Sequence, residues 1–225
     1  MDLSEFEKHL DLFSRLQHPS AAGINPEITF DDGHLSDYEV ALPLLVERNL
    51  KAHFFVTVGW IGNKNGYMEW SQLRALHQAG QTVGAHGWNH ELLTHCDKQG
   101  LVRELLEARL KLEDELGCRV TTMSLPGGRS NRRVLDACWE SGYSQVYSSL
   151  PRVESDPAAQ VIGRLNIRRE MALTWIEGLF DPRSKTISSL ERQARLKAAA
   201  RAVVGDKIYA QLWSALNRQE SESQP

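Results

Sequence analysis

The sequence contains no long apolar run, and no stretch approaches the roughly 20 residues that a membrane-spanning helix needs. It has three cysteines in 225 residues and no Cys-x-x-Cys pair, so free thiols in a reducing compartment are expected. It also lacks an excess of positive charge, because the formal net charge is -3, which excludes any general attraction to nucleic acid or anionic membranes. The acidic N-terminal segment has no apolar signal core, so we expect a cytoplasmic protein.

What the sequence does contain is enough apolar material for a substantial core. Hydrophobic residues make up 41% and charged residues 24%, as in ordinary globular domains. No linker rich in glycine, serine or proline marks a second domain. We therefore predict one domain over residues 1–225, with a C-terminal helical extension at 188–218 and a flexible tail at 219–225.

Short runs rich in β-branched and aromatic residues alternate with longer helical patterns. The expected strands lie at 28–30, 52–59, 82–86, 121–125, 143–148 and 161–167. The expected helices lie at 36–49, 71–79, 99–116 and 132–141, with further helices in the opening and closing segments, 3–16 and 188–218. This alternation predicts an α/β fold with parallel strands joined by right-handed crossovers, either barrel-like or open.

Two polar segments follow expected strands. Asp31 and Asp32 come directly after the first strand, and His86 and His90 lie at and just after the third. Adjacent carboxylates repel each other, and a buried carboxylate needs a partner. One carboxylate and two imidazoles around a divalent cation would supply that partner and leave open coordination positions. Because functional groups gather where parallel strands end, these residues are expected on one rim, with Asp31 free to handle protons.

The Thr-Phe-Asp-Asp-Gly and His-x-x-x-His segments together resemble the first two signature motifs of the polysaccharide deacetylase family, a group of carbohydrate esterases. The resemblance extends from about Phe6 to about Arg169 and includes a Pro-Gly-Gly third motif at 126–128. It implies a distorted, incomplete (β/α) barrel of about six to seven parallel strands with extra terminal helices. It also implies metal-assisted removal of an acetyl group from an acetylated sugar or glycan. Of the two possible groups, N-acetyl is expected ahead of O-acetyl.

The resemblance also implies roles for individual residues. Asp31 matches the general base, and Asp32, His86 and His90 match the metal ligands. Gly127 matches the position whose backbone N–H helps to stabilise the oxyanion, a role that glycine suits by allowing close approach. Zn²⁺ is the first choice of metal, with Co²⁺, Ni²⁺ and Mn²⁺ as alternatives.

The sequence departs from the family pattern at two places. Ser124 stands where an arginine usually orients the general base, and we predict that Arg129 takes over this task from another direction. The stretch 161–168 lacks the histidine that usually protonates the leaving group, and losing such an acid costs about a hundredfold in rate or more. Apart from that task of Arg129, two small basic groups, one of Arg129, Arg132 and Arg133 and the other of Arg164, Arg168 and Arg169, are interpreted as solvated residues of loops and helix starts.

These departures leave two alternative functions open. The first is a metal-dependent C–N hydrolase of a small linear or cyclic amide, and the second is a degenerate member that binds glycan without catalysis. Oligomeric state is left open.

The remaining polar and aromatic candidates have simpler interpretations. His53 is expected to be a satisfied group in a strand, and His34 a turn residue. His95 and Cys96 are interpreted as loop residues rather than ligands. Trp88 and Trp60 are candidates for an aromatic wall of the cleft.

Overall fold

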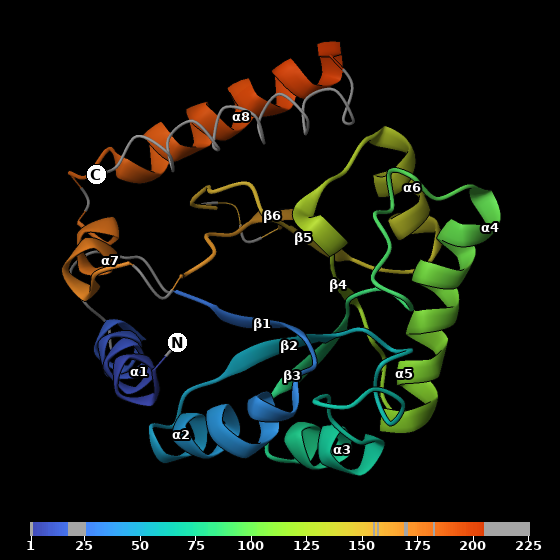
Figure 1. Ribbon diagram of the computed structural model, residues 1–225, viewed down its shortest axis with the longest axis horizontal. Helices are drawn as coiled ribbons and strands as arrows, with labels where there is room; N and C mark the ends of the chain where they lie inside the picture. Colours follow the sequence, from blue (N-terminus) through green and yellow to red (C-terminus); the bar gives the residue numbers. More distant parts are fainter. Residues whose placement is uncertain are drawn as a thin grey trace, which may run out of the picture.

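The computed structural model describes residues 2–17, 26–154, 156, 158–168, 171–181 and 183–204, with side chains to residue 199. Within these residues the chain forms one parallel sheet with strand order β1-β2-β3-β4-β5-β6. The strands are β1 (Ile28–Asp32), β2 (Ala52–Val56), β3 (Thr82–Ala85), β4 (Thr122–Ser124), β5 (Gln145–Ser148) and β6 (Val161–Gly163). The sheet curls into a half-barrel with helices along its outside (Figure 1), so the expected α/β fold, an incomplete (β/α) barrel, is confirmed.

The crossovers between strands carry most of the helices. They are α2 (Leu42–Glu47), α3 (Trp70–Gln78), α4 (Lys98–Leu101), α5 (Ala108–Leu116) and α6 (Arg132–Glu140). Two π-helical segments, η1 (Asp37–Ala41) and η2 (Val102–Glu107), precede α2 and α5, and a short 3-10 turn, η3 (Pro126–Gly128), follows β4. The continuous patterns expected at 36–49 and 99–116 are thus helical, but each includes a π-helical segment.

Local sequence signals explain where several helices begin and end. The Asn131 side chain accepts a hydrogen bond from the Val134 N–H at 3.0 Å and caps the start of α6. At the other end of a helix, Gly117 adopts a left-handed φ of 66° and ends α5.

The main core lies between the outer face of the sheet and the crossover helices. Leu45, Leu73, Leu105 and Val134 are fully buried there against strand residues such as Phe54. Parallel strands covered in this way are hydrophobic on the covered face. A smaller cluster around Leu12, Ile176 and Leu179 joins α1 (Leu3–Gln17) to α7 (Leu173–Leu179), a helix that we did not predict.

The inner, concave face of the half-barrel is polar. His53 lies 3.1 Å from Glu27, and the Tyr147 hydroxyl donates to Glu27 at 3.0 Å. His53 is therefore a satisfied, half-buried strand residue, as predicted. Because alternate residues of a strand point to opposite faces, Asp31 on β1 and Phe55 on β2 share this inner face with His53 and Tyr147.

The C-terminal segment is described only in part. Helix α8 (Thr186–Val204) runs along one side of the molecule (Figure 1), and the rest of the extension expected at 188–218 and the tail at 219–225 lie outside the described residues. The division of the chain into domain, extension and tail stays a prediction. In the described part of the chain, no helix is both long and apolar enough to cross a membrane.

Candidate metal centre

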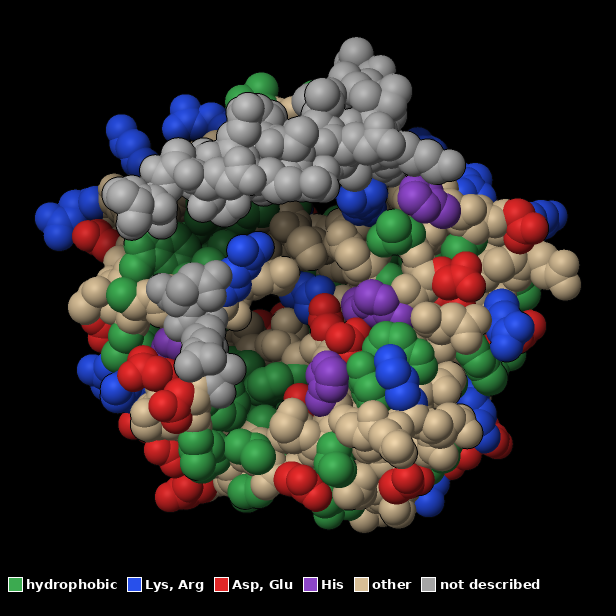
Figure 2. Space-filling model, in the orientation of Figure 1, with side chains coloured by type: hydrophobic (Ala, Val, Ile, Leu, Met, Phe, Trp, Pro, Cys, Tyr) green, Lys and Arg blue, Asp and Glu red, His purple; other side chains and the backbone are tan. Residues whose placement is uncertain are grey.

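The three candidate ligands converge at the ends of β1 and β3. The Nε2 atoms of His86 and His90 lie 3.5 Å and 3.4 Å from the same carboxylate oxygen, Oδ1 of Asp32. One donor atom from each of the three residues lies within 4.8 Å of the others. In the space-filling view, histidine and acidic side chains gather around a central hollow (Figure 2). Asp32 at the end of β1 and the two histidines after β3 are therefore brought to one point.

The backbone at this point adopts an uncommon conformation. Asp32 has a φ of 78° and His90 a φ of 63°, both in the left-handed region that non-glycine residues rarely occupy. Such conformations persist where the surrounding structure holds them, and they occur often at functional sites. Both residues belong to the candidate ligand set, so the strain lies where two ligand side chains are aimed at a shared point.

The hydrogen bond of His86 defines which ring nitrogen faces the site. Its side chain is 3% exposed, and Nδ1 lies 2.8 Å from the carbonyl oxygen of Ser124. A carbonyl can only accept, so Nδ1 carries the proton and Nε2 presents its lone pair to Asp32. Burial is the main cause that lowers the pKa of His86, although the charge of Asp31 opposes it. The ring is therefore neutral and suited to ligation at physiological pH.

This donor set fits a divalent cation. Oδ1 of Asp32 is buried and accepts no hydrogen bond from any described residue, yet it faces the unprotonated Nε2 of His86. Two lone-pair donors in contact, without a proton between them, repel each other. A cation bound by Asp32, His86 and His90 would remove this repulsion and would still have open positions for further ligands.

The loop between the two histidines is held by a buried carboxylate on η2. Glu104 is 1% exposed, and its oxygens accept the backbone N–H groups of Trp88 at 3.0 Å, Asn89 at 2.9 Å and Glu91 at 3.4 Å. Gly87, with a φ of 82°, leaves the space that this carboxylate occupies, because a Cβ there would lie 2.5 Å from Glu104 Oε2. Glu104 therefore fixes the direction in which His90 leaves the loop.

We expect Glu104→Gln to weaken binding of divalent metal by about tenfold while leaving the fold intact. Glutamine keeps the volume but turns an amide N–H₂ toward backbone donors that need an acceptor. The measurement is a competitive metal titration against a chromophoric chelator. The matched control is Glu107→Gln, an exchange in the same helical segment, which should leave the metal affinity unchanged.

The second aspartate is held by a residue that we did not predict. Arg164, just after β6, donates from Nη1 to Asp31 Oδ1 and from Nη2 to Asp31 Oδ2, both at 2.8 Å. Nη2 also donates to Ser124 Oγ at 2.6 Å, and this hydroxyl in turn donates to Asp31 at 3.2 Å. Such a two-pronged contact fixes both the position and the plane of the carboxylate.

The environment of Asp31 keeps it ionised. Burial by itself raises the pKa of this carboxyl, but the hydrogen bonds and charge of Arg164 and the nearby His86 outweigh it, so the pKa is lowered. Asp31 Oδ2 lies 3.9 Å from Nε2 of His86, which places it beside the candidate metal centre without joining it. An ionised carboxylate in this position can accept a proton from a group bound next to it.

Arg164 changes how the sequence is interpreted. It places a guanidinium on Asp31, the task that we expected of Arg129, and the role of Arg129 stays a prediction. Arg164 was expected to be a solvated loop residue, but its side chain is only 10% exposed and packs 5.5 Å from the ring centre of Phe55. The small side chain of Ser124 leaves room for this guanidinium, which also donates to Thr29 Oγ1 at 3.0 Å. Arg169 lies outside the described residues.

The same contacts join the two open edges of the sheet. Strands β1 and β6 are the first and last of the sheet and are not hydrogen-bonded neighbours. Arg164 connects them, because it follows β6 and its side chain ends on Thr29 and Asp31 of β1. The incomplete barrel is thereby closed by a polar side chain at the height of the site.

Three further residues singled out in the sequence, Gly127, Cys96 and Trp60, lie in different surroundings. Gly127 lies after β4 with a φ of 66°, and its assignment to the oxyanion stays a prediction. Cys96 contacts Glu91 and the Leu92 carbonyl rather than the ligand group, and all three cysteines are free thiols. Trp60 packs on His90, with ring centres 5.4 Å apart.

A further buried carboxylate, Asp37 on η1, titrates near neutrality. Burial raises its pKa to about 7, and the charges of Asp32 and Asp31 add to this, while a hydrogen bond to the His34 backbone opposes it. The folded protein therefore keeps this proton up to about pH 7, whereas the unfolded chain loses it near the ordinary value of 3.8. Stability from this group is fully present below the unfolded value and falls as pH rises toward 7.

For metal-free protein, we expect Asp37→Asn to raise the free energy of unfolding at pH 8 by roughly 2–4 kcal/mol relative to wild type. At pH 4 the two proteins should be equally stable, because Asp37 is then neutral in the folded state as well. Urea denaturation at both pH values, in the presence of a chelator, measures the difference. An equal effect at both pH values would contradict the titration as its cause.

The curled parallel sheet is a fold that is found among solved deacetylases. PplD of Streptococcus pyogenes, a deacetylase whose structure contains acetate, has this fold; the match covers 80% of this chain and 84% of PplD, with a TM-score of 0.67 and 19% identity. The profile of the family described as polysaccharide deacetylase matches residues 26–146, more than half of the chain. The chain belongs to the polysaccharide deacetylase family, as its motifs indicated.

Two sequence relatives carry names from this family. YxkH of Bacillus subtilis strain 168, named as a polysaccharide deacetylase, is 27% identical over 146 residues, which is 64% of this chain and 52% of YxkH. Chitin deacetylase 1 of Cryptococcus neoformans var. grubii is 25% identical over 119 residues, 53% of this chain and 24% of that protein. The chain thus spans about half the length of one relative and about a quarter of the other.

Proposed function

We propose that this protein is a divalent-metal-dependent hydrolase that removes the acetyl group from an N-acetylated sugar or glycan. The observation that carries the proposal is the meeting of Asp32, His86 and His90 around an unpartnered, buried carboxylate oxygen, beside an ionised Asp31. Membership of the polysaccharide deacetylase family supports the reaction class. The relative named as a chitin deacetylase supports nitrogen as the atom that carries the acetyl group, because chitin is an N-acetylated polymer.

Asp32, His86 and His90 would hold the cation, and zinc is our first choice for two imidazoles and one carboxylate. When bound, the cation would supply Lewis-acid chemistry, polarising the acetyl carbonyl and acidifying water. Asp31 would then accept the proton of the attacking water, and Arg164 keeps this carboxylate ionised and oriented. Gly127, on the same rim, is the proposed source of a backbone N–H for the oxyanion.

We assign the proton for the leaving nitrogen to this set as well. Arg164 stands in the stretch where the resemblance places a histidine acid, and a guanidinium does not release its proton in proteins. We therefore assign both proton steps to Asp31. It takes the proton from water as the C–O bond forms, and it delivers the same proton to the amine nitrogen as the C–N bond breaks. A carboxyl group whose pKa is held low is a good donor once it carries the proton.

The test is acetate release from N-acetylated oligosaccharides and from small linear and cyclic amides, with and without a chelator. The proposal predicts release from the saccharides that stops on chelation and returns on adding Zn²⁺ or Co²⁺. Turnover of the small amides alone would favour a different C–N hydrolase. Saccharide binding without any release would favour a non-catalytic role.

A further inference from the structure

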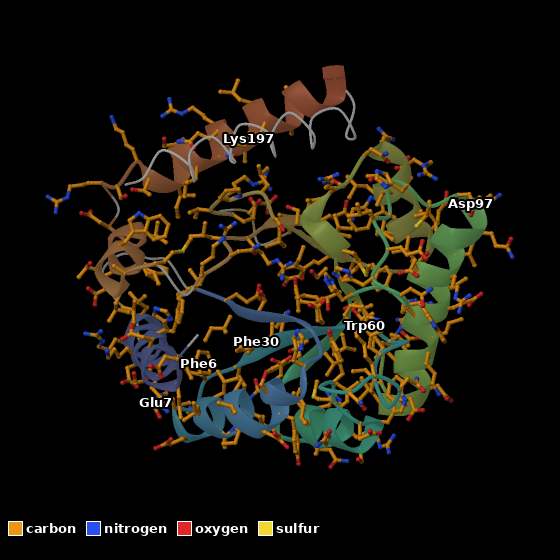
Figure 3. All side chains as sticks on the ribbon, viewed as in Figure 1. Phe6, Glu7, Phe30, Trp60, Asp97 and Lys197 are labelled. Atoms are coloured by element: carbon orange, nitrogen blue, oxygen red, sulfur yellow. The ribbon has the colours of Figure 1, made fainter. Side chains whose placement is uncertain are left out.

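A row of aromatic rings leads away from the candidate metal centre along the segment after β2. The ring of Trp60 lies 5.4 Å from that of His90, and Tyr67 lies 4.8 Å from Trp60. His34 stacks on Tyr67 with ring centres 4.6 Å apart, and its Nε2 lies 3.6 Å from Asp32. We call Trp60, Tyr67 and His34 the aromatic ledge (Trp60 is labelled in Figure 3). The ledge therefore touches the metal centre at both Asp32 and His90.

One exposed cation lies on this ledge. Nζ of Lys64 is 3.4 Å from the ring centre of Trp60 and 4.5 Å from that of Tyr67, and it donates to the Tyr67 hydroxyl at 3.4 Å. Within the described part of the chain, no carboxylate oxygen lies within 4.0 Å of this ammonium. Within the described residues, its charge is therefore met by two aromatic faces and one phenol hydroxyl rather than by a carboxylate.

The contacts of Lys64 are weak enough to be exchanged. An exposed cation–π contact is no stronger than an exposed ion pair, so the ammonium can turn from the rings to an anion at little cost. An anionic group near Trp60 would therefore draw the ammonium toward itself.

A cavity of about 330 Å³ adjoins the ledge. It is lined by Lys64, Tyr67 and several polar side chains: Asn63, Asn65, Gln72, Glu39 and Glu69. Amide and carboxylate groups of this kind suit the hydroxyl groups of a sugar, and the volume is within the range of ligand sites. The two glutamates would repel an anion inside the cavity, so a charged substituent belongs on the ledge beside Lys64.

We propose that Lys64 and the aromatic ledge form a subsite for a sugar unit that carries a negatively charged group, a carboxylate or a phosphate. This unit neighbours the one that is deacetylated, so the inference rests on the proposed function. The ammonium binds the charged group, Trp60 and Tyr67 cover the apolar face of the ring, and the amide-lined cavity receives its hydroxyls. The subsite selects acidic over neutral acetylated glycans.

The experiment compares three matched oligosaccharides of β-1,4-linked N-acetylglucosamine. One is neutral, one has its primary hydroxyls oxidised to carboxylates, and one has them phosphorylated. Wild type, Lys64→Met, Lys64→Arg and the control Lys51→Met are compared. Lys51 is an exposed lysine that precedes β2, whereas Lys64 follows it. For each combination of protein variant and oligosaccharide, kcat/KM is obtained from acetate release and Kd from calorimetry.

We expect Lys64→Met to lower both kcat/KM and affinity for the charged oligosaccharides by about tenfold, with less than a twofold change for the neutral one. Lys64→Arg should keep most of the preference, and Lys51→Met should behave as wild type. A loss confined to the carboxylate or the phosphate form supports the subsite and identifies the charged group.

Equal losses on neutral and charged oligosaccharides would overturn the subsite, because Lys64 would then only support the loop. No loss on any of them would overturn it as well. Lys64-dependent binding without acetate release would support the subsite and contradict the proposed deacetylation. Acetate release that is indifferent to Lys64 would contradict the subsite alone.

Discussion

Exchanging Asp31 for asparagine is expected to lower acetate release by at least about a thousandfold, while divalent metal stays bound. Asp31 is assigned both proton steps, and asparagine can perform neither. It would, however, keep an acceptor for Arg164 and Ser124, which contact both oxygens of Asp31. The proposed metal ligands are other residues, so the metal content should not change. The measurement combines turnover with metal analysis of the same preparation.

The matched control for this exchange is Asp136→Asn on the exposed surface of α6, where Asp136 pairs with Arg132. It removes the same type of side chain at a position that has no role in the proposed site. Turnover and metal content should therefore stay unchanged. If Asp31→Asn retained a tenth or more of wild-type turnover, the assignment of both proton steps to Asp31 would be wrong. Joint loss of metal and activity would instead show that Asp31 is needed for the metal site.

Exchanging Arg164 for methionine is expected to lower kcat/KM at neutral pH by about a hundredfold, and to move its acidic limb to higher pH. Arg164 lowers the pKa of Asp31 against the opposing effect of burial. Without the guanidinium, burial dominates and the pKa rises. The base must be ionised to act, so activity would then be lost at a higher pH on acidification than in wild type.

The pH profile separates this effect from simple loss of structure. Damage to the fold lowers the whole profile, whereas loss of the Arg164 contact also displaces its acidic limb. Arg164→Lys provides the comparison, because it keeps the charge without the two-pronged contact and should displace the limb less. An unchanged limb in Arg164→Met would contradict the role of Arg164 in keeping Asp31 ionised.

Much of the ligand group could be predicted because its information is local. Asp31 and Asp32 end β1, His86 and His90 follow β3 within a few residues, and parallel strands end on one rim. Strand–helix alternation likewise predicted that the strands are parallel. What local patterns could not show is the left-handed backbone of Asp32 and His90, since only the folded surroundings hold it.

The partner of Asp31 could not be found in this way, because 133 residues separate it from Arg164. Its only signal was an arginine close to the expected strand 161–167, and loop arginines are usually solvated. Strand β6 in fact ends at Gly163, and the side chain of the next residue, Arg164, contacts β1. In hindsight, Ser124 was the indirect sign, because a small residue in place of the usual arginine leaves space for another guanidinium.

Arg164 also connects the two departures from the family pattern, Ser124 and the absence of a histidine in 161–168. The guanidinium on Asp31 now comes from the stretch where the resemblance places the histidine acid. One arginine thus keeps the base oriented, and the same arginine occupies the place of the acid. Restoring both together, as Ser124→Arg with Arg164→His, is therefore a more consistent change than either exchange alone.

The central claim is that Asp32, His86 and His90 bind one divalent cation, and a metal titration of the purified protein tests it most directly. We predict one equivalent of Zn²⁺ or Co²⁺ per chain in wild type and in Asp31→Asn, and loss of this binding in Asp32→Ala. Thermal unfolding with and without chelator shows that each variant is folded. A wild-type protein without stoichiometric metal, or an Asp32→Ala variant that binds metal as wild type does, would contradict the account.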